Sequence, residues 1–255
     1  MKKPAVIIGM GEMGGVFARG LLRIGMPVYP LLRDDNLSAA METAPDPDIV
    51  LVSVAEKDLH PTLEQFPSQW HDRIALLQNE LLPRDWQTHD IDNPTVISVW
   101  FEKKKGQDFK ILVPSPIFGS KANILANALQ SMEIPTQLLT SKDDLLFQLV
   151  RKNVYILTTN IAGLVTEGTV EDLWSNHQQL ARDVAADVMD IQEWLTGSTL
   201  DRERLIQGMV DAINGDLEHK CMGRSAPARL ANAIAYADKA KLAVSKLRDI
   251  SSGNR

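Results

Sequence analysis

Three glycines near the N-terminus separate a short apolar run from a stretch with helical spacing. The run covers residues 5–8, and the G-x-G-x-x-G pattern that follows consists of Gly9, Met10, Gly11, Glu12, Met13 and Gly14. In this pattern the first glycine permits a tight turn, the second lets the backbone approach a pyrophosphate, and the third lets the helix pack close to the strand. The helix N-terminus would present free N–H groups to the phosphates. Residues 9–14 are therefore predicted to bind a dinucleotide; the alternative is a glycine turn of purely structural use.

The end of the next predicted strand, residues 26–33, bears on which dinucleotide is bound. An acidic residue in this window binds the ribose 2′-hydroxyl of NAD, whereas an arginine accommodates the 2′-phosphate of NADP. Arg33 lies in the window and is followed by Asp34 and Asp35. Because a guanidinium can bind a phosphate through two parallel hydrogen bonds, the sequence favours NADP over NAD. In the alternative, Arg33 is a surface residue paired with these aspartates, and Asp34 binds the ribose of NAD.

Strands and helices alternate as far as residue 140, which predicts a Rossmann-type, doubly wound and mainly parallel α/β sheet. The link from the second strand to the third holds at most a helical turn at residues 36–41, so no further strand is expected there. Ser53 and Val54 end a buried strand, at the edge where open α/β sheets bind ligands, and join the predicted cofactor site. The predicted strands are 5–8, 26–33, 49–54, 73–77, 96–100, 109–114 and 136–139, and the helices after the first are 59–66 and 123–132.

From residue 141 onward the pattern is entirely helical, which predicts a dinucleotide-binding domain at 1–140 and an all-α domain at 141–255. Ser141 with the acidic residues behind it is an N-terminal capping signal. The helix it begins runs to about residue 167 and is apolar on most faces, so we expect it to be buried. Further helices are expected at 178–195, 201–214 and 228–250.

Two polar residues interrupt the apolar helix. Lys152 and Asn160 are eight residues apart and therefore lie two turns apart on roughly the same side. A buried lysine is costly unless it is paired or its pKa falls. One reason to keep it is catalysis, because an ammonium group can donate a proton to a carbonyl as a hydride arrives. In the alternative, the lysine extends to the surface and the asparagine bonds locally.

Composition excludes several other classes of protein. A net charge of −6 over 255 residues argues against nucleic acid as the main partner. No apolar stretch approaches the roughly 20 residues of a membrane helix, so no membrane partner is expected. The lone Cys221 fits a reducing cytoplasm, and the five histidines show no metal-ligand spacing, so no metal site is expected.

Together these features resemble ketopantoate reductase and the wider 6-phosphogluconate-dehydrogenase-like superfamily. The resemblance rests on the glycine pattern, on Arg33, on Asn79 after the strand at 73–77, and on Lys152 after Arg151. It implies an NADPH-dependent oxidoreductase that reduces a small-molecule substrate, a 2-oxo acid or related carbonyl, and it suggests a homodimer. It also implies that Arg33 binds the 2′-phosphate, Asn79 lies near the nicotinamide, Lys152 donates the proton and Asn160 holds the substrate.

The chain departs from the family pattern on the substrate side. Glu80 stands where the family has glycine, and Ile156 replaces the first of two substrate-binding asparagines. The stretch 228–233 lacks the acidic residue that the family carries in its C-terminal helices. These departures leave alternatives open: a dinucleotide-binding sensor or regulatory protein with a degenerate substrate site, a reductase of C=N bonds, or a two-domain protein whose site has decayed altogether.

Overall fold

The computed structural model describes residues 2–33 and 35–253. By its internal contacts the chain divides into two compact units, Met1–Leu149 and Val150–Arg255. The division follows Leu149, inside a long helix, α6 (Lys142–Thr166), and thus nine residues after the boundary at residue 140 predicted from the sequence.

In the first unit, the described residues form one seven-stranded sheet with the order β2-β1-β3-β4-β5-β8-β9. Strands β1 to β5 are parallel, whereas β8 is antiparallel to β5 and β9 is parallel to β8. The predicted doubly wound, mainly parallel fold is therefore confirmed. The strands are β1 (Ala5–Ile8), β2 (Val28–Leu31), β3 (Ile49–Val52), β4 (Ile74–Leu76), β5 (Thr95–Ile97), β8 (Ser115–Phe118) and β9 (Thr136–Leu138).

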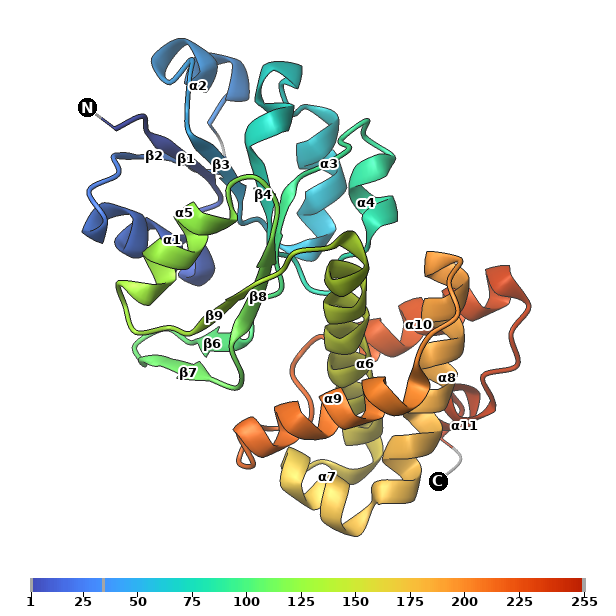
Figure 1. Ribbon diagram of the computed structural model, residues 1–255. Coiled ribbons are helices and arrows are strands. Elements are labelled where there is room, and N and C mark those ends of the chain that lie inside the picture. The colour runs from blue at the N-terminus through green and yellow to red at the C-terminus, as the bar shows by residue number, and fades with distance from the viewer. Residues whose placement is uncertain (1, 34, 254–255) are drawn as a thin grey trace. The chain divides into compact units, whose positions relative to one another are not determined.

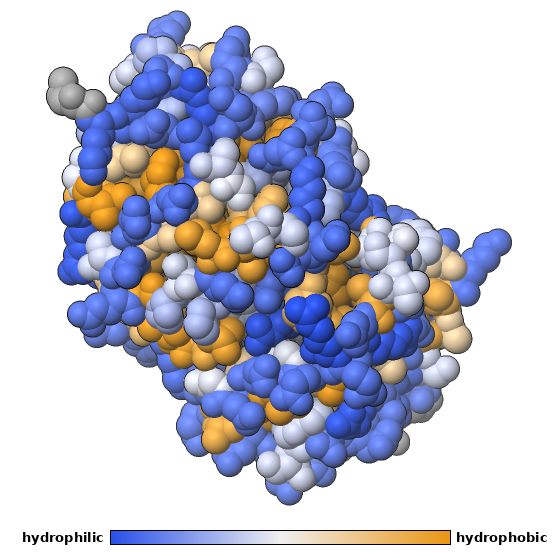
Figure 2. Space-filling model, in the orientation of Figure 1, coloured by the Kyte–Doolittle hydropathy of each residue, from blue (hydrophilic) through white to orange (hydrophobic). Residues whose placement is uncertain are grey.

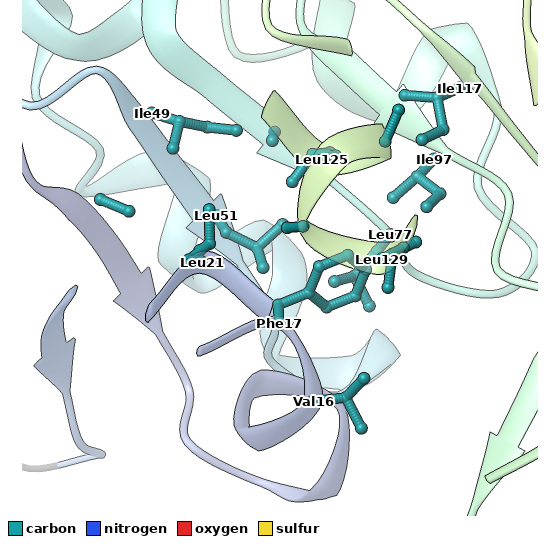
Figure 3. Close-up of a cluster of buried hydrophobic side chains, with 14 of the residues drawn as sticks. Val16, Phe17, Leu21, Ile49, Leu51, Leu77, Ile97, Ile117, Leu125 and Leu129 are labelled. Atoms are coloured by element: carbon teal, nitrogen blue, oxygen red, sulfur yellow. The ribbon is translucent and has the colours of Figure 1, made fainter. Parts of the chain in front are cut away.

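Helices cover both faces of this sheet. Figure 1 shows α1 (Glu12–Arg23) and α5 (Ala122–Gln130) on one side, with α3 (Leu59–Glu64) and α4 (Pro83–Gln87) on the other. Under α1 and α5 lies a cluster of buried apolar side chains, including Phe17, Leu51 and Leu125 (Figure 3). The two helices approach so closely that a Cβ on Gly20 of α1 would lie 2.5 Å from the Ala128 carbonyl oxygen of α5.

The strand predicted at 109–114 was misplaced. Residues Phe109–Ile111 form β7, which pairs with β6 (Phe101–Lys103) in a separate two-stranded sheet. The strand that continues the main sheet is β8, which the sequence did not indicate because it is short and contains Pro116. Proline cannot donate to a strand ladder, so its presence argues against a sheet interior.

Two short helices of the first unit were also underestimated. Residues 36–41 were expected to hold at most a turn, but α2 (Leu37–Thr43) is a helix whose N-cap, Asn36, accepts the Ser38 N–H through its side chain at 2.8 Å. The second is α4, which begins at Pro83, a residue whose fixed φ suits a first helical position. Five residues are too few to show helical periodicity.

The second unit is helical, as predicted. After α6 come α7 (Val170–Asn176), α8 (Gln178–Thr196), α9 (Arg202–Gly215), α10 (Ala226–Ala240) and α11 (Ser245–Ser251). The Ser141 hydroxyl accepts the Asp144 N–H at 3.0 Å at the start of α6, which confirms the capping signal.

The long helix expected at 228–250 is instead two helices. Lys241 ends α10 with φ +56°, and Val244 precedes α11 with φ +40°. Helices often end in this left-handed conformation, but glycine usually adopts it. The sequence did not predict this break because no glycine or proline marks it. Asp187 of α8 stabilises the new helix start because its carboxylate accepts the N–H groups of Lys246 and Leu247.

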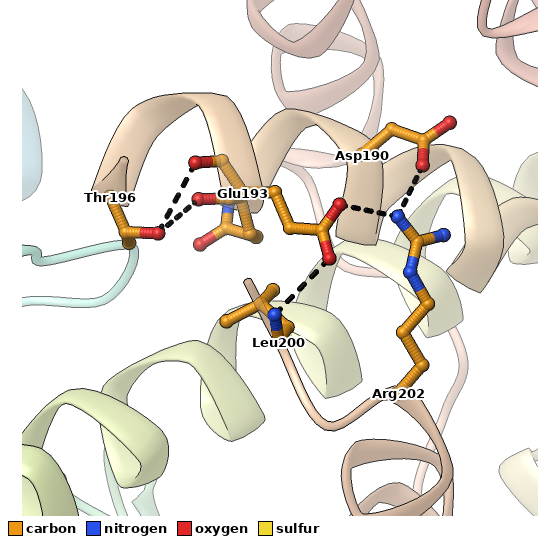
Figure 4. A network of polar contacts seen from close by, with 6 residues as sticks. Asp190, Glu193, Thr196, Leu200 and Arg202 are labelled. Atoms are coloured by element: carbon orange, nitrogen blue, oxygen red, sulfur yellow. Dashed lines mark hydrogen bonds and ion pairs between the residues drawn. The ribbon is translucent and has the colours of Figure 1, made fainter. Parts of the chain in front are cut away.

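A polar network joins α8 to α9 (Figure 4). The Arg202 guanidinium bonds both Asp190, at 2.6 Å, and Glu193, at 2.5 Å, and Glu193 also accepts the Leu200 N–H. The Arg202 hydrogen bond lowers the pKa of Glu193. These groups are partly exposed, so each pair contributes about 0–1 kcal/mol to stability.

The molecular face in Figure 2 is mainly hydrophilic, with groups of apolar residues between hydrophilic ones. Throughout the described residues, no helix combines the length and apolar character needed to cross a membrane.

Candidate functional site

The glycine turn between β1 and α1 is held against the ends of β2 and β3. The Gly9 N–H donates to the Leu31 carbonyl, and the Ser53 N–H donates to the Ile8 carbonyl. Gly9 has φ +94°, and a Cβ on it would lie 2.9 Å from the Ser53 backbone. A Cβ on Gly14 would lie only 2.2 Å from the Gly9 carbonyl oxygen. Both positions therefore require glycine because of the protein's own backbone.

Gly11 differs from these two glycines. It is the N-cap of α1, it makes no side-chain cap hydrogen bond, and a Cβ built on it would meet no described atom within 4 Å. The first turn of α1 therefore begins beside open space, where its N–H groups can bind a phosphate. Glycine here is not required by packing, which fits a pyrophosphate that approaches the backbone closely.

Ser53 and Val54 lie beside this turn, as the sequence predicted from the end of β3. The Ser53 hydroxyl oxygen is buried, lacks a hydrogen-bond partner among the described residues, and would lie 3.4 Å from a Cβ on Gly14. A Cβ on Gly9 would lie 3.1 Å from the Val54 nitrogen. The structure thus brings together Gly9, Gly14, Ser53 and Val54, and the unsatisfied hydroxyl is consistent with a ligand at this point.

Glu12 has a partner that the sequence did not predict. The Lys103 ammonium lies 3.3 Å from the Glu12 carboxylate and donates to the Lys104 carbonyl at 2.7 Å. Lys103 ends β6, and its side chain is only 13% exposed. Its positive charge offsets the one carboxylate in the first turn of α1, and this favours an anion there.

Arg33 follows β2 and is highly exposed, with 83% of its side chain accessible. Its guanidinium lies 3.7 Å from Asp58, beyond the end of β3. Asp35 instead accepts the Leu32 N–H at 2.7 Å and closes the local turn. Asp34, which in the alternative would bind the ribose of NAD, lies outside the described residues. Because an exposed ion pair contributes about 0–1 kcal/mol, Asp58 would not prevent Arg33 from binding a phosphate.

Asn79 lies after β4, at the same edge of the sheet. Its side-chain amide donates to the Glu56 carboxylate at 2.9 Å. The preceding Gln78, which the sequence did not single out, is buried and donates to the carbonyls of Val52 and Val54, so it ties the ends of β3 and β4 together. Glu80 has φ +58°, a conformation that glycine adopts without strain. Glu80 therefore holds a backbone conformation that would suit a glycine.

In the second unit, Lys152 and Asn160 are buried within α6, with exposed fractions of 6% and 8%. The alternative in which Lys152 extends to the surface is therefore wrong. Ile156, one turn from each, is only partly buried. This face of the helix thus has an accessible apolar residue between two covered polar ones.

Asn160 is engaged at both ends of its amide. Its nitrogen donates to the Cys221 carbonyl at 3.3 Å, and its oxygen accepts a hydrogen bond from the Arg229 guanidinium at 2.9 Å. Arg229 belongs to the stretch that the sequence showed to lack an acidic residue, but its contact with Asn160 was not foreseen. Burial raises the pKa of the Cys221 thiol to about 11.

Neither a metal site nor the cavity of the first unit adds to these residues. Within the described ranges, no group of three or more histidine, cysteine or acidic side chains is placed to hold a metal. A cavity of about 650 Å³ in the first unit is lined by residues such as Asp72, Asn93 and Gly119. These residues precede β4 and β5 or follow β8, so the cavity lies at the amino ends of the parallel strands, opposite the predicted cofactor site.

Comparison with solved structures gives the same fold over nearly the whole chain. A 2-dehydropantoate 2-reductase from Methylococcus capsulatus is 13% identical, with 98% of this chain and 94% of that chain covered and a TM-score of 0.69. A probable 2-dehydropantoate 2-reductase from Bacillus subtilis is 15% identical, with 98% of both chains covered and a TM-score of 0.68. A D-mandelate dehydrogenase in complex with NADH is 12% identical, with 99% and 97% covered and a TM-score of 0.67.

The protein is thus structurally similar to ketopantoate reductases, the 2-dehydropantoate 2-reductases, as the sequence resemblance predicted. It is also structurally similar to D-mandelate dehydrogenase, which the sequence did not suggest. No protein-family model and no curated protein sequence matches the chain. At 12–15% identity the likeness defines the fold: a mostly parallel α/β sheet followed by a helical region.

Proposed function

We propose that this protein is an NADPH-dependent oxidoreductase that reduces a small 2-oxo acid or a related carbonyl compound. The observation that carries the proposal is Lys152, a lysine with 6% exposure in a chain whose β1–α1 turn leaves open space at Gly11. A lysine with so little exposure, on the same helix as Asn160, is suited to donate a proton to a bound carbonyl. The structurally similar D-mandelate dehydrogenase, which was solved with NADH, supports the reaction class.

The residues divide the work as follows. The backbone of residues 9–14, together with Ser53 and Val54, holds the pyrophosphate side of the cofactor, and Arg33 binds its 2′-phosphate. The nicotinamide supplies a hydride when bound. Asn79 orients the reacting groups, and Lys152 donates a proton to the carbonyl oxygen as the carbonyl carbon is reduced. Asn160 contributes to holding the substrate.

The test combines a substrate panel with a matched pair of variants. Wild type is expected to consume NADPH with at least one 2-oxo acid, and Lys152→Ala is expected to lower kcat by roughly 100- to 10,000-fold, the usual contribution of a general acid. The control is Lys142→Ala, an exposed lysine in the first turn of the same helix. If Lys152→Ala turned over within a few-fold of wild type, Lys152 would not be the proton donor.

A second candidate function follows from Ile156 and from the engaged amide of Asn160. Both features reduce the hydrogen bonding available to a polar substrate. Weak substrate binding would suit a dinucleotide-binding sensor. Tight NADPH binding without consumption across a panel of keto acids and imines would favour the sensor over the reductase.

The same proposal includes the cellular compartment and the oligomeric state of the protein. A lone cysteine suits the reducing cytoplasm, and a structurally similar ketopantoate reductase from Staphylococcus aureus is described as dimeric. We therefore expect a cytoplasmic homodimer, and light scattering after size-exclusion chromatography would measure its mass.

A further inference from the structure

The hairpin of β6 and β7 packs against α1. Phe101 of β6 is buried, and the centroid of its ring lies 6.4 Å from that of Phe17 of α1. Residues two positions apart in a strand point to the same face, so Lys103 faces α1 as Phe101 does. Lys103 pairs with Phe109 of β7, which packs against the same buried cluster. The hairpin therefore holds the Lys103 side chain beside α1.

Lys103 reaches the first turn of α1. Its ammonium group lies 3.3 Å from the Glu12 carboxylate and donates to the Lys104 carbonyl at 2.7 Å. The side chain of Lys103 is 13% exposed, whereas that of Glu12 is 46% exposed. Because solvent screens a mostly buried charge only weakly, this ammonium group acts on its surroundings more strongly than a surface lysine would.

Glu12 directly follows Gly11, the N-cap of α1 that adjoins open space. A carboxylate in a first helical turn stabilises the helix because it lies at the positive end of the dipole. The same carboxylate repels a pyrophosphate that binds at the N–H groups of this turn. Lys103 brings the opposite charge to this place, so the pair of Glu12 and Lys103 adds no net charge to the turn.

We propose that Lys103 is a positioning residue of the cofactor site, which balances the charge of Glu12 and holds its carboxylate on the side of the hairpin. The N-terminus of α1 is then left to the pyrophosphate. This inference rests on the dinucleotide binding of the proposed function and adds the β6–β7 hairpin to that site. The backbone of the glycine turn contacts the pyrophosphate, and Lys103 acts through Glu12. The ligand chemistry is that of a nucleoside diphosphate.

The test measures the Kd of ADP, which carries a diphosphate but no nicotinamide, by isothermal titration calorimetry. Lys103→Met keeps a side chain of similar length but removes the charge, and it is expected to raise the Kd by roughly 30-fold. Adding Glu12→Gln to Lys103→Met should return the Kd close to the wild-type value, because the carboxylate that repels the diphosphate is then gone. Lys103→Arg, which keeps the charge, should bind ADP nearly as the wild type does.

Lys105→Met is the matched control, since it removes one positive charge from an exposed position in the turn of the same hairpin, and it should leave the Kd of ADP unchanged. Glu12→Gln alone leaves Lys103 in place and should lower the Kd; a raised Kd would contradict the proposal. If Lys103 were merely structural, Lys103→Met would lower the melting temperature, and adding Glu12→Gln would not restore ADP binding. That result would overturn the assignment, as would an unchanged Kd for Lys103→Met.

The use of ADP separates this inference from the reductase proposal. ADP binding that depends on Lys103 and Glu12 as expected, without consumption of NADPH by any 2-oxo acid, would support the role of Lys103 while contradicting the reductase proposal. Turnover of a 2-oxo acid, with an ADP affinity and a KM for NADPH that Lys103→Met leaves unchanged, would support the reductase and contradict the role of Lys103. Absence of ADP binding to the wild type would also overturn that role.

Discussion

The glycine turn of the first unit and the α6 face of the second, the two regions proposed to bind ligands, differ in the atoms that they offer. The turn uses backbone atoms: Gly9 and Gly14 are required by clashes that a Cβ would cause, and Gly11 leaves open space. The α6 face uses side chains, namely Lys152, Ile156 and Asn160. Gly9 and Gly14 cannot be replaced without disturbing the turn, whereas the side chains on the α6 face can change one at a time. This contrast fits a glycine pattern that is complete in the first unit and a helix face in the second that departs from the family pattern.

The largest expected effect is a loss of stability at Gly14, where the turn packs against its own backbone. Gly14→Ala places a Cβ 2.2 Å from the Gly9 carbonyl oxygen, an overlap that backbone movement must relieve. Overpacking of this kind costs about 3 kcal/mol, so we expect the melting temperature to fall by roughly 10 °C. Calorimetry of the protein without cofactor measures this. A melting temperature equal to that of the wild type would show that the turn is looser than described.

Gly11→Ala should separate binding from folding. The added methyl meets no described atom within 4 Å, so the melting temperature without cofactor should stay unchanged. NADPH affinity should nevertheless fall by about 100-fold, because the methyl occupies the space that the pyrophosphate needs. Fluorescence titration gives the Kd. Gly15→Ala is the control, since its Cβ also meets nothing within 4 Å, and it should bind NADPH as the wild type does. Equal NADPH affinity for the wild type and both variants would show that the pyrophosphate does not bind at this turn.

Arg33 tests the cofactor choice, with a somewhat smaller effect. Arg33→Ala should weaken NADPH binding by roughly 30-fold and leave NADH binding unchanged, because a charge-assisted contact to the 2′-phosphate is lost. The comparison of thermal shifts with the two cofactors measures this. Asp58→Asn, which removes the ion-pair partner of Arg33, should slightly strengthen NADPH binding. A parallel loss for both cofactors would assign Arg33 a different role.

Ile156 tests whether the α6 face can be changed one residue at a time. Ile156→Asn introduces the residue that the resembled family has at this position and should raise kcat/KM for a hydroxylated 2-oxo acid, relative to an aliphatic one, by about 10-fold. The physical reason is that an amide can bond the hydroxyl, whereas isoleucine cannot. Ile156→Val, which stays apolar, should retain the original preference. No shift in the ratio for Ile156→Asn would place this residue away from the substrate.

The smallest effect concerns Cys221, whose carbonyl supports Asn160. Burial raises the thiol pKa from 9.0 to about 11, so the folded protein binds this proton more tightly than the unfolded chain. The stability it contributes is fully present below about pH 9 and is lost as the pH rises through about 11. Denaturant titrations across this range should show a steeper alkaline loss for the wild type than for Cys221→Ser. Identical slopes would contradict the burial of the thiol.

Local patterns were sufficient for much of the fold. The alternation of strands and helices predicted the parallel sheet, and the apolar stretch after Ser141 predicted a buried α6. Errors arose where a local signal was weak or contrary: Pro116 argued against β8, and Lys241 breaks the last helix in a conformation that lysine rarely adopts. Short elements such as α4 carry too few residues for a periodic pattern.

The candidate site divides along the same line. The sequence by itself determined the glycine turn and the shared face of Lys152 and Asn160, because both follow from positions close together in the chain. Only the tertiary structure placed Lys103 against Glu12 and Arg229 against Asn160, residues that are 91 and 69 positions apart. Contacts of this kind depend on how distant segments pack, and no local propensity records them. The open space at Gly11 is likewise a property of the folded backbone, since the three glycines of the turn are identical in sequence and only their surroundings distinguish them.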